Sequence, residues 1–344
     1  MLEFLADYAG FLIRLLSIAL IVLLIVAVVA GNKGKQRKGN LSVVKLNEGY
    51  KAMKEELRKQ LHDKKALKKE QKALKKEQKA KAKEKSKETS EAPAKRVYVL
   101  DFDGDIKASA VSSLREEVSA ILSVATQQDE VVVRLESPGG VVHGYGLAAS
   151  QLQRIRDKGI PLTVTVDKVA ASGGYMMACV ADKIVAAPFA ILGSIGVVAQ
   201  VPNIHRLLDK SNIDVELHTA GKYKRTLTML GENTDEGREK FKQDLEDTHE
   251  LFKRFVSGNR PVLEMDSIAT GETWYGSEAL ENHLADEVMT SDAYLEQFYA
   301  DTDVLHVSYR EPKPLTERFG MSVLSAVETK AIGWLTKILN TKGY

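Results

Sequence analysis

The sequence predicts a layered α/β domain with buried parallel strands, preceded by a membrane anchor and a basic helical linker. From Arg96 onward, segments rich in β-branched residues alternate with segments whose apolar residues recur at helical spacing. Continuous apolar runs such as Val131–Val133 are typical of strands covered on both faces, as in parallel sheets. The chain has 344 residues, a formal net charge of +2 and one cysteine, so no intramolecular disulfide can form.

Residues 1–32 are predicted to anchor the chain in a membrane. The 20 residues Phe11–Ala30 are apolar apart from Arg14 and one serine, and a helix of that length crosses a hydrocarbon core of about 30 Å. The alternative is a cleaved signal peptide ending near Ala30. Glu3 and Asp7, rather than a basic cluster, precede the run, which favours a retained anchor.

Residues 33–93 form a basic, low-complexity linker. The heptad ALKKEQK occurs twice in tandem, at 66–72 and 73–79, and its residues are good helix formers with a thin apolar stripe. A solvated helical spacer is the simplest interpretation, and contact with anionic lipid headgroups is the alternative. No aromatic residue lies among the lysines between Lys51 and Arg96, which argues against nucleic acid as a partner.

The folded part is predicted to span residues 94–310, with its first strand beginning near Arg96. Strands are expected within 96–106, 130–140, 160–170 and 304–309, and helices within 109–125, 145–159, 173–183 and 244–255. The apolar runs 183–188 and 195–202 read as short strands. Ile184–Val201 has no charged residue over 18 positions, but Pro188, Gly193 and Gly196 interrupt it, so we reject a second membrane span there.

Two glycine-containing turns carry the chemical signals. Ser172 falls between a predicted strand and a predicted helix, where the free N–H groups of a first helical turn favour negative charge. Gly173 and Gly174 leave room for an incoming carbonyl. The turn Ser137–Gly140 follows another strand, so the two turns together could form an oxyanion hole. Each signal alone is weak, because such motifs also occur as helix caps and plain turns.

Four motifs in order make the combination specific: ESPGGVVHGYG, AASGGYMMACVADKIVA, GSIGVV and AGKYKRTL. Together they resemble the signal peptide peptidase A family of membrane serine peptidases, most closely the branch with a membrane-anchored, charge-rich N-terminal extension. The resemblance runs from the anchor to about Ser308. It implies a ClpP/crotonase-like α/β fold and a Ser–Lys dyad that needs neither a metal nor a cofactor.

The resemblance also implies the roles of individual residues. The nucleophile falls on Ser172, the general base on Lys224 of GKYK, and an accessory serine that holds the lysine amine on Ser194. The oxyanion donors fall among Gly139, Gly140 and Gly173.

The choice of base keeps two alternatives, His143 and Lys222. A free lysine has a pKa of about 10.4, whereas a useful base has one of about 7 to 8, so the lysine needs apolar surroundings. The uncharged Ile184–Val201 run is the expected wall. Tyr223 is expected to pack, and Cys179 is read as a small buried residue.

We therefore expect a membrane-anchored serine endopeptidase of a bacterial inner membrane. Its substrates would be signal-peptide-like peptides or membrane-protein fragments, cleaved after small or apolar side chains. The alternative is a crotonase-like acyl-CoA enzyme or a non-catalytic membrane scaffold. The membrane side stays open, because the basic residues after the anchor indicate a cytoplasmic domain whereas the resemblance indicates the exported side.

Assembly is the last expectation. The segment 311–344 contains an amphipathic helix, Ser322–Leu339, whose apolar face needs a partner surface. The resemblance implies a ring-shaped homo-oligomer in which neighbouring subunits help to build each site.

Overall fold

The computed structural model describes residues 15–17, 39–61 and 95–311. Residues 41–309 form one compact unit, and it is this unit that carries the predicted site. Three predicted features lie outside the described residues: the anchor (except residues 15–17), the tandem heptads and the C-terminal segment 312–344. Among the described residues, no helix is both long enough and apolar enough to cross a membrane.

The main sheet of the compact unit has its strands in the order β1-β10-β2-β3-β4-β6-β9. Its centre is parallel and fully covered, with Val99 opposite Val132 and Val133 opposite Val164. Because both faces of the sheet are buried, successive positions along these strands need apolar side chains, and the valine runs provide them. The strands are β1 (Asn40–Lys45), β2 (Arg96–Asp103), β3 (Glu130–Glu136), β4 (Leu162–Val166), β6 (Lys183–Ala186), β9 (Glu287–Val288) and β10 (Asp303–Arg310).

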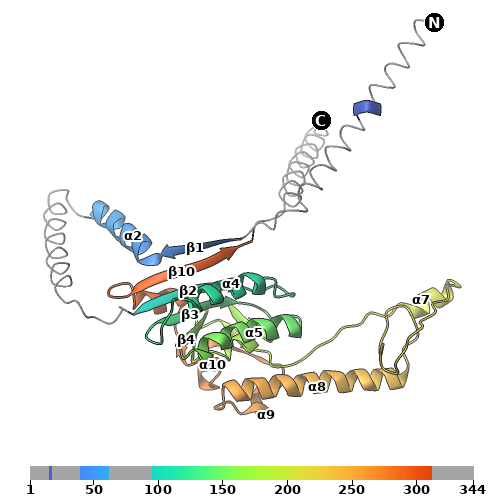
Figure 1. Ribbon diagram of the computed structural model, residues 1–344. Coiled ribbons are helices and arrows are strands. Elements are labelled where there is room, and N and C mark those ends of the chain that lie inside the picture. The colour runs from blue at the N-terminus through green and yellow to red at the C-terminus, as the bar shows by residue number, and fades with distance from the viewer. Residues whose placement is uncertain (1–14, 18–38, 62–94, 312–344) are drawn as a thin grey trace, which may run out of the picture. The chain divides into compact units, whose positions relative to one another are not determined.

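Helices cover both faces of this sheet (Figure 1). On one face, α4 (Val111–Leu122), α5 (Val142–Asp157) and α6 (Gly173–Ala178) bury the larger core. On the other, α11 (Ser291–Glu296) packs against the valines at the start of the strands. The layered α/β prediction is confirmed.

A second, three-stranded sheet has the order β5-β7-β8 and holds the two predicted site serines at its end. Its strands are β5 (Val169–Ala171), β7 (Ile191–Gly193) and β8 (Thr273–Tyr275). The sequence predicts a single strand over 160–170, but the chain leaves the main sheet after Val166 and enters the second sheet at Val169. This turn brings the chain across to the Ser137 segment, which bridges to Ala170.

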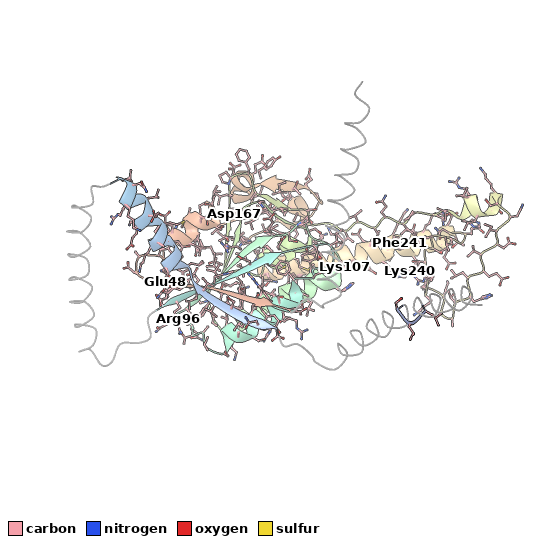
Figure 2. The ribbon with its side chains drawn as sticks, turned by 90° about the horizontal axis from the view of Figure 1, so that it is seen from above. Glu48, Arg96, Lys107, Asp167, Lys240 and Phe241 are labelled. Carbon is pink, nitrogen blue, oxygen red and sulfur yellow. The ribbon has the colours of Figure 1, made fainter. Side chains whose placement is uncertain are left out.

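The long helix α8 (Asp235–Asn259) anchors its C-terminal half on the core, where Phe252 and Val256 are buried. Its N-terminal half and the preceding α7 (His205–Lys210) extend away from the sheets (Figure 1). Figure 2 labels Lys240 and Phe241 on this extending part, well apart from Asp167 at the end of β4. The short helices α9 (Met265–Ile268) and α10 (Gly276–Glu281) complete the unit.

The predicted start of the folded part is wrong. Within the expected linker, β1 joins the edge of the main sheet beside β10, and α2 (Leu46–Leu61) follows it. Asn47 fixes this segment, because its side chain donates to the carbonyls of Tyr299 and Thr302 and accepts the N–H of Val304 at 2.8 Å.

The expectation for the run 195–202 is also wrong. The strand in this part of the chain is β7, Ile191–Gly193, and residues after it have no regular structure. Val198 is 92% exposed, so this end of the run is no apolar wall within one subunit. The beginning of the run forms β6, in agreement with short strands rather than a membrane span.

Candidate active site

Ser172 sits at the junction between β5 and α6 in a strained backbone conformation. Its φ of 53° and ψ of −117° lie where non-glycine residues rarely occur. The strain is held by the Ser172 N–H, which donates to the carbonyl of Gly193 at 2.8 Å, and by the first bond of α6 to its own carbonyl. Strained residues held in this way cluster at active sites, and a sharp strand-to-helix turn is a known way to present a nucleophile.

Ser194 occupies the matching position on the neighbouring strand. Ala171 and Gly193 are register partners of parallel strands, so Ser172 and Ser194 leave the second sheet at the same end. Ser194 also has a positive φ, 52°, and its N–H donates to the carbonyl of Glu272 at 2.6 Å. The structure therefore brings together two of the predicted site residues.

The turn after β3 reaches the same place. A Cβ built on Gly139 would lie 2.8 Å from both the Ser172 Cβ and the Gly173 nitrogen, and its φ is +89°, so only glycine fits there. The Gly139 N–H donates to Ser137 Oγ at 3.1 Å. Within residues 95–311, the N–H groups of Gly140 and Gly173 donate to no protein acceptor. The geometry favours these two as donors to a bound oxyanion.

Lys224 does not reach this place within one subunit. The segment around it lies on the first turns of α8, where Lys222 pairs with Glu236 and the Thr226 carbonyl lies against Gly237. The second serine is near the other half of α8, because His249 Nε2 contacts the carbonyl of Ile195 at 3.2 Å. Gly237 and His249 are twelve residues apart, about 18 Å along the helix axis.

Figure 1 shows the same separation: the chain between α7 and α8 lies at the end of α8 that is remote from the sheets. Lys224 itself is exposed. A lysine side chain does not span such a gap, so the predicted dyad is not assembled in a single copy of the chain.

The two alternative bases have different surroundings. Lys222 is bound to Glu236 at 2.7 Å, and that contact raises its pKa above the ordinary lysine value, which opposes a role as base. His143 lies in the first turn of α5 and is exposed.

The comparisons with known proteins identify the chain. The model of the peptidase family S49 N-terminal region matches residues 3–152, and that of peptidase family S49 matches residues 154–304. A protein named Probable protease SohB, from Haemophilus influenzae, is 54% identical over 326 residues, 92% of each chain. The chain belongs to peptidase family S49. It is a serine peptidase of that family.

A second relative and one solved structure are also similar to this chain. A Probable protease SohB from Buchnera aphidicola subsp. Schlechtendalia chinensis is 50% identical to this S49 peptidase over 86% of this chain and 99% of its own. Among solved structures, the 1510-N membrane-bound stomatin-specific protease matches with a TM-score of 0.42 and 13% identity, over 62% of this chain and 98% of its own.

The small residues close in sequence to Ser172 and Ser194, which would form the walls behind the predicted preference for small or apolar side chains, are buried in the S49 peptidase. Ala170 and Ala186 are fully buried, and Ala171 and Ala187 are nearly so. They line no open surface in one subunit, and the preference for small or apolar side chains stays a prediction. Cys179 is buried in the core as expected, and burial raises the pKa of its thiol to about 12.

Sequence reasoning missed the support beneath the S49 site. The sequence predicts Ser137 only as part of a turn and indicates no role for Tyr145. Both are fully buried, and their hydroxyl oxygens lie 2.6 Å apart directly under the Gly139 turn. The signal was a tyrosine eight residues after the serine, which carries information only once α5 is folded back on the turn. Among the described residues, no cluster of His, Cys, Asp and Glu could hold a metal ion.

Proposed function

We propose that the chain is a membrane-anchored endopeptidase in which Ser172 attacks the peptide carbonyl. The observation that carries the proposal is the strained Ser172, which lies beside Ser194 and against the Gly139 turn. Attack transfers the Ser172 hydroxyl proton to the general base, forms a bond from Oγ to the carbonyl carbon and moves the carbonyl electron pair onto the oxygen. The free N–H groups of Gly140 and Gly173 are the donors for the resulting negative charge. Collapse of this intermediate expels the amine, which takes the proton from the base, and water then hydrolyses the acyl-enzyme.

We infer that the general base is Lys224 of a neighbouring subunit. Lysine acts as a base only where its amine is kept neutral, which burial among apolar groups achieves. Exposed Lys224 has no such surroundings in one subunit. Its segment, 197–234, instead displays unpartnered apolar side chains, among them Val198, Leu207 and Leu217, each more than half exposed. Burial of this arm on a second copy would cover those side chains and deliver the lysine.

Ser194 is proposed to hold the arriving amine. It leaves β7 one residue after the register partner of Ala171, so an amine bound to its hydroxyl would also face Ser172. This arrangement extends the predicted ring: each subunit supplies both serines of one site and the lysine of the next. We propose a ring of about four or more subunits, because heterologous contacts of this kind close as rings.

The remaining proposals concern place and substrate. Residues 1–32 anchor the enzyme in a bacterial inner membrane, with peptides such as signal-peptide-like segments or membrane-protein fragments as substrates. We also propose that the layered α/β domain has the ClpP/crotonase-like fold. Membership in a serine peptidase family supports a peptidase over the acyl-CoA and scaffold alternatives.

A fluorophosphonate probe on the full-length, detergent-extracted protein tests the nucleophile. Activated serine reacts with the probe, so we expect one labelled site that mass spectrometry locates at Ser172. The Ser172→Ala variant should lose both labelling and peptide hydrolysis. Hydrolysis that persists in this variant would show that another residue is the nucleophile.

A further inference from the structure

A chain of buried hydrogen bonds runs beneath the turn that faces Ser172. Ser137 Oγ accepts the Gly139 N–H at 3.1 Å and lies 2.6 Å from Tyr145 Oη, which in turn donates to the Asp105 carbonyl at 2.8 Å. Because a carbonyl only accepts, the tyrosine proton is committed to Asp105, and the Ser137 hydroxyl must donate to Tyr145. The chain therefore runs in one direction and satisfies each hydroxyl, an arrangement that stiffens such networks.

The ring of Tyr145 supports the opposite side of the site. Tyr145 comes from α5 and is fully buried, and a Cβ on Gly173 would collide with its ring. The Gly173 backbone therefore rests directly on the ring. A Cβ on Gly174 would lie 2.5 Å from the Ser137 carbonyl oxygen, so the start of α6 and the turn after β3 touch without a gap.

We propose that Tyr145 and Ser137 are positioning residues of the peptidase reaction, which fix the Gly139–Gly140 turn and Gly173 at the separation an oxyanion hole requires. The inference rests on the proposed assignment of Ser172 as the nucleophile. Neither side chain touches the reacting atoms, since both residues are fully buried. They act through the backbone: the hydroxyl chain holds the turn and the ring holds Gly173.

The position of the backbone donors in the Gly139–Gly140 turn and at Gly173 affects the reaction rate. Donors stabilise a developing oxyanion only at hydrogen-bond distance from the position it will occupy, and loss of one donor costs about 100- to 1000-fold in kcat. Removing the Tyr145 hydroxyl leaves the Ser137 hydroxyl without its acceptor, whereas the Asp105 carbonyl loses one donor and keeps the Ala108 N–H. The turn can then shift, while the groups that bind the rest of the peptide stay in place. The loss should appear in the transition state rather than in substrate binding.

The test compares Tyr145→Phe and Ser137→Ala with Tyr294→Phe in the full-length protein. Tyr294 is the matched control, because it is also buried and its hydroxyl donates to Glu130 at 2.6 Å, on the other face of the main sheet. We expect Tyr145→Phe to lower kcat about 10- to 100-fold with KM within about twofold. Tyr294→Phe should leave kcat unchanged at temperatures where all variants are folded.

Peptide aldehydes give the second readout. An aldehyde forms a reversible hemiacetal with the nucleophilic serine, whose oxygen occupies the oxyanion position. Its inhibition constant should rise in Tyr145→Phe and in Ser137→Ala by the same factor by which kcat/KM falls. Because the two residues act through one network, the double variant should lose no more aldehyde affinity than the more impaired single variant.

The outcomes separate the two hypotheses. An unchanged kcat and aldehyde affinity in folded Tyr145→Phe would overturn the positioning role, with Ser172 still labelled by the probe. A loss of activity equal to that of Tyr294→Phe at equal thermal stability would also overturn it, because the effect would then be structural. Hydrolysis by Ser172→Ala would instead overturn the nucleophile assignment.

Discussion

The backbone N–H of Ser172 donates to the carbonyl of Gly193, 2.8 Å away, and Gly193 is followed at once by Ser194. This bond joins the ends of two parallel strands and places both serines where the second sheet stops. Both residues have a φ close to 53°. The strain at one serine is therefore held by the strand that carries the other, and the pair behaves as one structural unit.

We expect Ser172→Ala to abolish hydrolysis and Ser194→Ala to reduce it. In the proposed mechanism Ser172 forms the covalent bond and Ser194 only orients the base, and a base displaced by about 1 Å costs roughly 100-fold. Ser194→Ala should therefore keep a measurable kcat and still react slowly with a fluorophosphonate. Steady-state kinetics and probe labelling of both variants check the order. Equal, complete loss in both would contradict separate roles.

The single cysteine should be inert in the native protein. Cys179 is fully buried, and burial raises the pKa of its thiol to about 12. At pH 8 almost none of the thiol is ionised, and only the thiolate is reactive. Ellman's reagent should find no reactive thiol until denaturant is added, and then one per chain. Rapid reaction in the folded enzyme, accompanied by loss of hydrolysis, would contradict this placement.

Most of the central sheet could be predicted because its cause is local. A strand covered on both faces needs apolar residues in succession, and Val131–Val133 provides them. The pairing of Ala171 with Gly193 was beyond sequence reasoning, since register between short strands depends on tertiary contacts. The same holds for Tyr145, whose hydroxyl reaches the turn only because α5 folds back over the sheet.

The segment β1–α2 escaped prediction for a different reason. Its lysines continue those of the basic linker. Apolar residues recur at helical spacing from Leu46 to Leu61, but those beyond Tyr50 are exposed, so this stripe does not mark a docked helix. Besides the pairing of β1 with β10, the segment is held by a small set of contacts with residues 299–304: Asn47 to Val304, Tyr50 on Tyr299, and Lys45 to Asp303 at 2.6 Å. Such long-range pairs leave no periodic signal.

We therefore expect Asn47→Ala to destabilise the protein by about 2 kcal/mol, since buried backbone groups lose their partners. The side chain is only 3% exposed and makes three hydrogen bonds to Tyr299, Thr302 and Val304. Gln60→Ala is the control, because Gln60 is exposed at the end of the same helix. Urea unfolding of both variants gives the difference. Equal stability would show that α2 docks loosely.

Lys224→Ala should abolish hydrolysis, whereas Lys222→Ala should leave most of it. The two lysines are neighbours on the same exposed segment, but Lys222 is tied to Glu236, whose contact raises its pKa and keeps it charged. His143→Ala should also retain substantial activity. If His143→Ala is inactive and Lys224→Ala is active, the lysine mechanism is wrong.

Mixing two inactive variants tests whether the lysine acts between subunits. Ser172→Ala keeps its lysine and Lys224→Ala keeps its serine, so a mixed ring contains some sites with both groups intact. Random co-assembly from equal amounts should restore about a quarter of the wild-type activity, because each site draws on two independent subunits. The separation of Lys224 from the serines along α8 predicts this recovery.

Subunits exchanged by mild dissociation, or co-expressed with different tags and purified as hetero-oligomers, provide the sample. Verified hetero-oligomers without activity would show that each chain supplies its own base, which requires the arm 197–234 to fold back onto its own sheet.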